Sequence, residues 1–506
     1  MFLEVIPEDH FLRRLLQAID FEAFRPLLEA AYTGFGRPPL DSVFLLKLEL
    51  LARQYRLSDR EVIAAARFNI TYRLFLGISL KSPLPHHTLL TYFRQRLGPE
   101  RLQPVFDGLV GQARRLGLVK DRLRLKDATH ILANIAVPST IRLVAEVRDQ
   151  LLEALRPLAG EQVAEEEQQA EAIRVGTEDA KDEERLLRRV THLRTVLAWA
   201  DDVPEQDAWF QISDQAREKV RAALTLAHKI LADRDDPQAG DKVRSLHDAE
   251  ARCGKHGGFY DGYLLDVAMD ADSELLTAIN VLPANGDEGA DAAHLITQEE
   301  RTQGNDVQAL SIDGAGYRGD VLRELTDPKG LNLEVYVPPT ERLPLTVFGS
   351  ELFTLSDDGQ TLTCPAGQTT QSAGRYGHKS GRRFRFSWKQ CTGCPLRSQC
   401  LTNPEGRTSR TVFKNDYESE YRAAQAQTQT PAYAQTRKEH PAIERKLSEL
   451  VNRHDMRHAR YRGRAKVLVQ GLLTGLVVNL KRMVRLLFAS PKPASGTVRA
   501  EMASLG

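Results

Sequence analysis

The chain has 506 residues, enough for about three to four domains, and its hydrophobic fraction of 42% is that of a protein with a real core. Its net charge of +1 excludes a basic field over the whole surface as an argument for nucleic-acid binding. The N-terminus does not read as a signal peptide, and the most apolar segment, 467–478, is shorter than the ~20 residues of a membrane span. We therefore expect a soluble, cytoplasmic protein without a membrane partner.

Residues 1–118 carry the pattern of an all-helical domain. Asp41 is a candidate N-cap for an apolar helix over 43–55. Ser58 and Glu61 have the spacing of a capping box that opens the next helix.

A proline- and histidine-containing break at 83–88 precedes a further expected helix over 89–97, which carries Arg94 and Arg96. A helix, a turn and a second helix with exposed arginines are compatible with DNA contact and dimerisation. The alternative is a plain helical bundle with a solvated polar face.

From Leu123 the hydrophobic period changes to two, which predicts a strand that ends at Asp127. Residues 139–250 are then expected to form an antiparallel helical pair inserted in a strand-rich domain. Strand patterns return at 263–269 and 275–281, separated by a polar turn, so this pair predicts a β-hairpin.

The remaining pattern is a helix over 289–298, a strand that ends at Asp313, a helix over 320–325 and a strand over 333–337. This order predicts an α+β fold: an RNase H-like mixed sheet with flanking helices, a helical N-terminal DNA-binding domain, a helical insert and a small Cys-rich insert. The expected segments are 1–118 (helical domain), 119–138 (first catalytic part), 139–250 (helical insert), 251–340 (catalytic core), 341–440 (irregular Cys-rich insert), 441–490 (C-terminal helices with a basic patch) and 491–506 (tail).

Three acidic residues have the placement that a metal-dependent nuclease needs. Asp127 and Asp313 each close a strand, and Glu444 lies on a helical stretch near the C-terminus. Carboxylates held rigidly at strand ends suit Mg²⁺ or Mn²⁺, and two such ions can cut and rejoin phosphodiester bonds. The alternative is that each Asp merely ends its strand as a turn residue.

Short motifs along residues 40–488 give a family resemblance. They are Tyr72–Gly77, His87–Leu97, Lys126–Thr129, Gly262–Tyr263, Pro283–Asn285, Asp313–Tyr317, Tyr461–Gly463 and Asn479–Arg482, together with the helix of Glu444. In this order the chain resembles the DDE transposases of bacterial insertion sequences, in the branch with a helical N-terminal domain and a cysteine-bearing insert before the last acid.

The resemblance implies that Asp127, Asp313 and Glu444 hold two Mg²⁺ or Mn²⁺ ions per active site. Glu449 lies on the same expected helix and stays open as the third acid, although the family pattern places the acid directly after an Ile, here Ile443. Asp287, after the Pro283–Asn285 motif, is expected to have a lesser, structural role.

The function implied is a nucleoid-associated enzyme that binds the terminal inverted repeats of its element as a homodimer. It would cleave double-stranded DNA at those ends and join them to target DNA without ATP. A catalytically silent DNA-binding protein that kept the fold is the alternative.

Basic residues follow Glu444 with only Asp455 among them: Arg453, Arg457, Arg460, Arg462, Arg464 and Lys466. Beside a phosphate-cutting site, such residues are expected to bind the DNA backbone, and Tyr461 and His458 could stack on an unpaired base. The alternative is a solvated helix face.

Four of the five cysteines crowd into one segment: Cys364, Cys391, Cys394 and Cys400. The C-x-x-C pair at 391 and 394 has the spacing of a zinc knuckle, and the other two thiolates could complete a tetrahedral site. We expect a structural Zn²⁺ here, with four free thiols in a reducing cytosol as the alternative.

Overall fold

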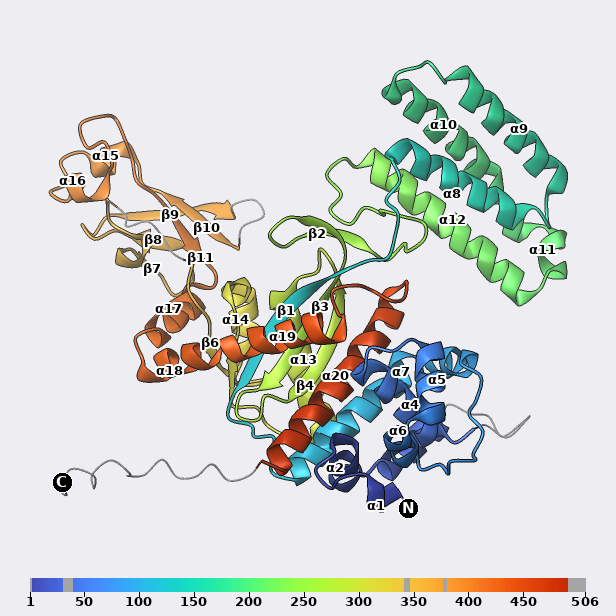
Figure 1. Cartoon of the computed structure of the whole chain (residues 1–506). Coiled ribbons are helices and arrows are strands. Elements are labelled where there is room, and N and C mark those ends of the chain that lie inside the picture. The colour runs from blue at the N-terminus through green and yellow to red at the C-terminus, as the bar shows by residue number, and fades with distance from the viewer. Residues whose placement is uncertain (1, 31–39, 341–345, 376–379, 490–506) are drawn as a thin grey trace, which may run out of the picture.

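The computed structural model describes residues 2–30, 40–340, 346–375 and 380–489, and the expected tail 491–506 lies outside them. The described residues form a central mixed sheet between helices, a separate unit of helices and a second, smaller sheet (Figure 1). The α+β class expected from the sequence is confirmed.

The N-terminal part is helical throughout the described residues. Its elements are α1 (Phe2–Val5), α2 (Phe11–Ala18), η1 (Glu22–Phe24), α3 (Arg25–Glu29), α4 (Ser42–Gln54), α5 (Asp59–Phe68), α6 (Ile70–Leu76) and α7 (Thr88–Arg115). Asp41 caps α4 by accepting a hydrogen bond from the Phe44 amide at 2.8 Å, and Ser58 and Glu61 form the expected capping box of α5.

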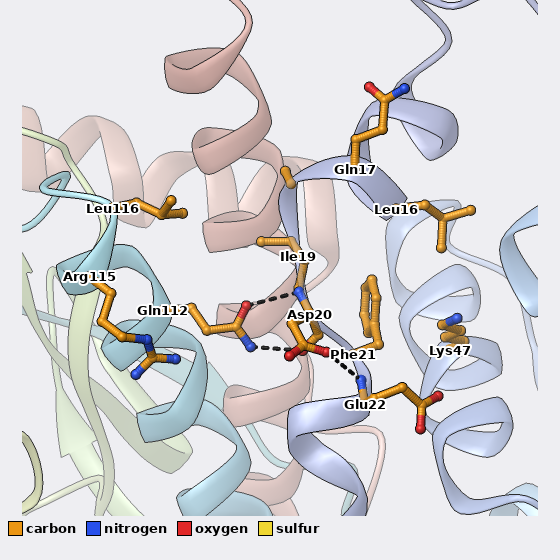
Figure 2. A pocket seen from close by; sticks show the side chains of 11 residues that line it. Leu16, Gln17, Ile19, Asp20, Phe21, Glu22, Lys47, Gln112, Arg115 and Leu116 are labelled. Carbon is orange, nitrogen blue, oxygen red and sulfur yellow. Dashed lines mark hydrogen bonds between the residues drawn. The ribbon is translucent and has the colours of Figure 1, made fainter.

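Helix α7 is longer than its sequence pattern indicates, because it continues beyond a kink at Gly98, where φ is +56°. Its second half anchors the chain that follows α2. Figure 2 shows the Gln112 side chain paired with the backbone of Asp20: its oxygen accepts from the Asp20 amide at 3.0 Å, and its nitrogen donates to the Asp20 carbonyl at 2.8 Å. The amide of Gln112 therefore ties the first helices to α7.

The central sheet contains six strands among the described residues: β1 (Arg124–Leu132), β2 (Arg252–Lys255), β3 (Phe259–Asp270), β4 (Leu276–Pro283), β5 (Ala309–Ser311) and β6 (Glu334–Tyr336). Strand β3 pairs antiparallel with β1, β2 and β4, whereas β5 runs parallel to β1 and to β6. The expected hairpin is confirmed as β3 and β4; the sequence pattern missed β2.

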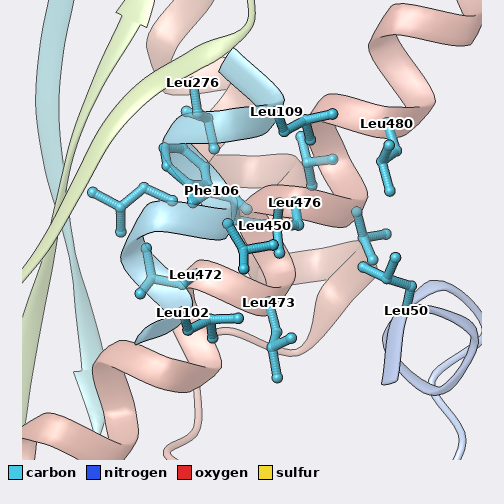
Figure 3. Packing of buried hydrophobic residues seen from close by; sticks show 14 of the residues in the cluster. Leu50, Leu102, Phe106, Leu109, Leu276, Leu450, Leu472, Leu473, Leu476 and Leu480 are labelled. Carbon is cyan, nitrogen blue, oxygen red and sulfur yellow. The ribbon is translucent and has the colours of Figure 1, made fainter. Parts of the chain in front are cut away.

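One face of this sheet joins the N-terminal helices to the C-terminal helices α19 (Pro441–His454) and α20 (Arg464–Leu487) in a single hydrophobic core. Figure 3 shows Phe106 and Leu109 of α7 packed among Leu472, Leu476 and Leu480 of α20. Among the described helices, α20 alone is long and apolar enough to cross a membrane, and 83% of its most apolar window is buried in the protein. That burial is the property of a core helix.

The opposite face packs against α13 (Glu288–Gln303), α14 (Gly319–Thr326) and α17 (Glu418–Gln427). The 3-10 turn η3 (Gly314–Gly316) lies between β5 and α14 and contacts α13. The sheet is therefore covered on both faces, as its apolar strands require.

The segment expected as one antiparallel helical pair contains more helices than that. Its described elements are α8 (Thr140–Leu155), α9 (Gly160–Gly176), α10 (Asp182–Ala200), η2 (Val203–Glu205), α11 (Asp207–Gln211) and α12 (Asp214–Asp235). These helices lie together (Figure 1), and they enclose a core of their own around Leu151, Leu193 and Ala227. The expectation of a single pair was wrong because the acidic stretch at 161–171, interpreted as solvated, forms α9, which buries Val163.

The segment expected to be irregular contains a second sheet. Within the described residues its strands are β7 (Thr354–Leu355), β8 (Thr361–Thr363), β9 (Thr369–Arg375), β10 (Gly381–Arg385) and β11 (Thr411–Asn415), in antiparallel order β11-β10-β9-β8-β7. Short helices accompany them: η4 (Ser350–Leu352), α15 (Trp388–Cys391), α16 (Arg397–Cys400) and, farther on, α18 (Pro431–Glu439). These strands escaped prediction because they are short and mostly polar.

A buried ion network fixes the start of β1. Arg124 has no exposed side-chain surface; its guanidinium donates to Glu299 of α13 at 2.6 Å and to Asp270 of β3 at 3.0 Å. Glu299 also pairs with Arg114 of α7 at 2.9 Å. The network therefore joins α7, β1, β3 and α13 at one point.

We predict that Arg124→Met lowers the free energy of unfolding by about 3–5 kcal/mol, because it leaves the buried Glu299 and Asp270 carboxylates without their main cation. Chemical denaturation of the whole chain measures this. Arg122→Met is the matched control, since Arg122 is half exposed, its pairs with Asp272 and Glu439 lie at the surface, and its loss should cost at most about 1 kcal/mol. Equal losses in the two variants would contradict the role given to the buried network.

Candidate active site

Asp127 and Asp313 are brought together by the parallel pairing of β1 with β5. Leu125 is the register partner of Ser311, and each acid follows its partnered residue by two positions along the chain. Asp127 is the fourth residue of β1, which continues to Leu132, so the expectation that the strand ends at Asp127 was wrong; Asp313 does follow the end of β5. Burial is the main cause that raises the pKa of Asp127 to about 7, and the charges of Asp313 and Glu288 contribute to this rise. Two neighbouring carboxylates and a raised pKa make a chemically unusual site.

Glu288 is the acid that the sequence pattern missed. It is the first residue of α13 and half-buried, and its pKa is raised by burial and by the charge of Asp313. Its only sequence signal is its place directly after Asp287, near the end of the Pro283–Asn285 motif.

A second buried ion pair positions Glu288. Lys126 of β1 lies 2.9 Å from Asp266 of β3, and its ammonium donates to the main-chain oxygen of Glu288 at 2.5 Å. The next residue, Gly289, approaches so close to Ala315 that a Cβ there would lie 2.6 Å from the Ala315 carbonyl oxygen. The start of α13 is therefore fixed against both β1 and the turn that follows Asp313.

Asp287 accepts a hydrogen bond from the Ala290 amide at 3.0 Å and forms an ion pair with Arg318. These contacts hold its carboxylate as the cap of α13.

Glu444 lies in the first turn of α19, which packs along β1. His440, one helical turn earlier, is 3.0 Å from the hydroxyl of Ser311 and so ties the start of α19 to β5. Glu444 is exposed, and it is not among the charges with the largest effect on Asp127. The alternative acid, Glu449, is already paired with Lys481 at 2.8 Å and Lys446 at 3.3 Å, which contributes to lowering its pKa despite its partial burial.

Beyond the acids, β1 carries His130, whose ring lies 4.8 Å from that of His256 and 5.0 Å from that of Tyr260, centroid to centroid. Burial lowers the pKa of His130 to about 4, with Arg457 and His256 adding to the effect. This aromatic cluster lies close enough to Glu288 for the charge of His256 to counteract the rise in its pKa.

In the part of the chain that the structure describes, no three His, Cys, Asp or Glu side chains are arranged to hold a metal ion as they stand. The chemistry of the donors nevertheless fits a divalent cation. Asp127, Asp313 and Glu288 are hard oxygen ligands whose mutual repulsion a cation would relieve.

The basic residues singled out in the sequence lie in different surroundings. Arg94 pairs with Glu49 at 2.5 Å and Asp59 at 2.6 Å, Arg96 is exposed, and Arg453 is exposed at the end of α19. Arg457 donates to the His130 carbonyl at 2.6 Å, and the amide of Leu132 donates to the Arg457 carbonyl at 2.8 Å. The segment after α19 therefore runs beside the end of β1.

The rest of this basic run surrounds the start of α20. Arg460 is 3.8 Å from Asp455, Arg462 donates to the Asn134 carbonyl at 3.3 Å, and the amide of Arg464 donates to Glu250 at 2.8 Å. Arg462, Arg464 and Lys466 are exposed.

Tyr461 does not present a free ring. Its hydroxyl accepts from Arg53 at 2.8 Å, and the guanidinium groups of Arg53 and Arg94 lie 5.7 and 5.5 Å from its ring centroid. This side chain is engaged within the protein, whereas His458 is exposed.

The four cysteines expected to bind zinc all line one small cavity at the edge of the second sheet. All four are free thiols, and burial raises the pKa of Cys400, with the other three cysteines adding to the effect. Their neighbours are Phe353 and Phe386 of a small aromatic core.

His454, near the end of α19, gives a pH-dependent prediction. It is 4% exposed, and burial and the adjacent Lys481 lower its pKa to about 4, against the opposite effect of Glu449. In the unfolded chain this histidine takes up a proton near pH 6.5, whereas His454 in the folded protein stays neutral until about pH 4. The free energy of unfolding therefore falls as the pH falls from 6.5 to 4.

We predict that His454→Gln removes up to about 3 kcal/mol of the stability difference between pH 7 and pH 4.5, measured by denaturation at both pH values. His458→Gln, at an exposed position four residues later, should keep the wild-type pH dependence. If His454→Gln were as pH-dependent as wild type, the buried neutral state of this ring would be refuted.

Residues 1–96 match the family described as a transposase domain (DUF772), and residues 363–484 match the family described as a transposase DDE domain. The second match includes Glu444 and the four cysteines, whereas Asp127 and Asp313 lie between the two matches. No solved structure matches the chain. The two family matches confirm the resemblance to DDE transposases of insertion sequences, and they indicate that the chain is a transposase.

Proposed function

We propose that this transposase binds the terminal inverted repeats of an insertion sequence and catalyses metal-dependent cleavage and transfer of DNA strands. The observation that carries the proposal is the convergence of Asp127, within β1, and Asp313, just after β5, which the parallel pairing of these two strands brings together. The two residues are far apart in the sequence, and their carboxylates influence each other in the fold.

The topology supports an RNase H-like catalytic sheet. Across the sheet, the antiparallel strands β4, β3 and β1 lie next to one another, and β5 and β6 continue the sheet beside β1 in parallel orientation. The helices α8–α12 and the second sheet are then insertions into this arrangement, with the proposed boundaries 139–250 and 341–440.

Asp127 and Asp313 would hold two Mg²⁺ or Mn²⁺ ions, with Glu444 as the proposed third acid and Glu288 beside them. Two such ions supply activation of the attacking oxygen and stabilisation of the leaving oxygen. Glu444 is favoured over Glu449 because Glu449 is neutralised by Lys481 and Lys446. The exposure of Glu444 leaves its carboxylate open to a metal ion and a DNA phosphate.

The chemistry consists of two in-line displacements. In the first, a water oxygen attacks the phosphorus at the element's end, the bond from phosphorus to the 3′ oxygen breaks, and a 3′-hydroxyl and a 5′-phosphate are released. In the second, that 3′-hydroxyl attacks a phosphorus of target DNA, whose own 3′ oxygen leaves as a hydroxyl. Asp127 and Asp313 would act in both steps by holding the divalent cations that a reacting phosphate contacts, and a homodimer would pair the two ends.

We predict that Asp127→Asn slows cleavage of a labelled element end by at least about 100-fold, the scale on which loss of one electrostatic contact to the reacting groups slows an enzyme. The assay uses Mg²⁺, Mn²⁺ or Ca²⁺, with end binding measured in parallel. Binding should stay close to wild type, because no DNA contact is assigned to Asp127. An active Asp127→Asn protein would refute the assignment, and specific binding without cleavage by wild type would favour a silent DNA-binding protein.

Glu444→Gln and Glu449→Gln are a matched pair on one helix. Cleavage should be lost in the first and kept in the second, provided that thermal unfolding shows both to be folded. The reverse result would make Glu449 the third acid.

We also propose that Cys364, Cys391, Cys394 and Cys400 bind one structural Zn²⁺. The second sheet has only a small buried core, made of Phe353, Leu362, Phe384, Phe386 and Val412. A unit of this size commonly needs a metal for stability, and four thiols around one cavity are a suitable ligand set.

Metal analysis of the purified chain should find about one zinc per molecule, as expected for a single tetrahedral thiolate site. Cys394→Ser should lower that content and increase hydrogen exchange in β8–β11, whereas Cys253→Ser, on β2, should change neither. Wild-type protein that is folded and free of zinc would contradict the site.

A further inference from the structure

A cavity of about 670 Å³ lies where three segments distant in sequence meet. Its walls come from the first half of α7, with Arg94 and Gln95, from Asn134 after β1, and from the start of α20 with the loop before it, which contribute Arg460, Arg462 and Lys466. One wall thus belongs to the first matched family segment and another to the second. A ligand in this cavity would contact both.

The cavity has an excess of positive charge. No acidic side chain of the described residues lines it, and of its four basic residues only Arg94 is fully neutralised, by Glu49 and Asp59. Arg460 has Asp455 at 3.8 Å, and burial together with the charge of Arg53 lowers its pKa.

Two cations at the cavity form no salt bridge among the described residues: Lys466 of its wall, and Arg53, which shares the charge of Glu49 with Arg94. Arg53, behind Tyr461, is 4% exposed, and its buried Nη1 atom has no hydrogen-bond partner among the described residues. Lys466 is exposed in the first turn of α20, where the helix dipole is also positive. Cations are unfavourable at the N-terminal end of a helix unless an anion is bound nearby. Glu250, which accepts from the Arg464 amide, supplies one negative charge at this end of α20.

The surroundings favour a phosphate over a base as the ligand. The ring of Tyr461, the aromatic side chain of the cavity, has the guanidinium groups of Arg53 and Arg94 at 5.7 and 5.5 Å from its centroid, and its hydroxyl accepts from Arg53, so this side chain is already engaged within the protein. Arg462 and Lys466 present flexible cationic ends, which neutralise a phosphate without reading sequence.

We propose that this cavity binds a backbone phosphate of the element's terminal DNA at a fixed distance from the cleaved bond, an inference that rests on the proposed function. Asn134 follows Asp127 by seven residues, most of them in β1, which places the cavity about 20 Å from the catalytic acids at ~3.3 Å per residue. At 3.4 Å per base pair, the bound phosphate lies about six base pairs from the cleaved one.

The test measures affinity rather than cleavage, with full-length Asp313→Asn protein and duplex ends that carry one uncharged methylphosphonate linkage, scanned along each strand. Lys466→Ala should weaken binding of the unmodified end about 3- to 10-fold and reduce the salt dependence by about one ion. With the methylphosphonate about five to seven nucleotides from the cleavage position, the same substitution should have no further effect. Lys219→Ala, an exposed lysine on α12, is the matched control and should leave affinity and salt dependence unchanged.

A Lys466→Ala penalty that is the same for every methylphosphonate position would overturn the proposal. So would an affinity equal to that of the Lys219→Ala control. Failure of the wild-type protein to cleave the unmodified end would count against the proposed function alone, because the comparison of affinities does not depend on cleavage.

Discussion

The buried guanidinium of Arg124 fixes the start of β1, the strand that carries Asp127. It contacts Glu299 and Asp270 at the first residue of β1, and Glu299 in turn holds Arg114 of α7. A shift of β1 by one residue would break these contacts and would also turn every later side chain of the strand to the opposite face. The position of Asp127, three residues along, therefore depends on this ion network as well as on the pairing of β1 with β3.

The acids of the candidate site lie on elements that are fixed to the central sheet by different contacts. Asp127 and Asp313 are attached to paired strands, and Glu288 is fixed through Lys126 and the close approach of Gly289 to Ala315. Glu444 is on a helix tied to the sheet through His440 and Ser311, and its carboxylate is exposed. The charges of Asp313 and Glu288 thus act on Asp127 in the fold, whereas Glu444, the proposed third acid, is exposed.

Local signals in the sequence predicted local structure well. The Asp41 cap, the Ser58–Glu61 capping box and the β3–β4 hairpin all depend on residues close in the chain, and the structure confirms them. The strands of the second sheet were missed because they are short and mostly polar, and helix α9 was missed because its acidic sequence has few apolar residues that indicate a buried face. Nothing in the sequence around Glu288 or Arg124 indicated their surroundings: the partners of Arg124 lie 146 and 175 residues away. The cation contacts that Arg53 and Arg94 make with Tyr461 likewise join residues far apart in the sequence.

The central claim is that the carboxylates around Asp127 and Asp313 form the metal site. Iron-mediated cleavage of the polypeptide tests it most directly: Fe²⁺ replaces Mg²⁺, a peroxide and ascorbate pulse cuts the backbone near the bound ion, and mass spectrometry locates the cuts. The account predicts cuts in β1 around Asp127, in the turn after Asp313 and at the start of α13 or α19, all suppressed by excess Mg²⁺ and absent from Asp127→Asn. Cuts confined to other parts of the chain, or unchanged by that substitution, would contradict it.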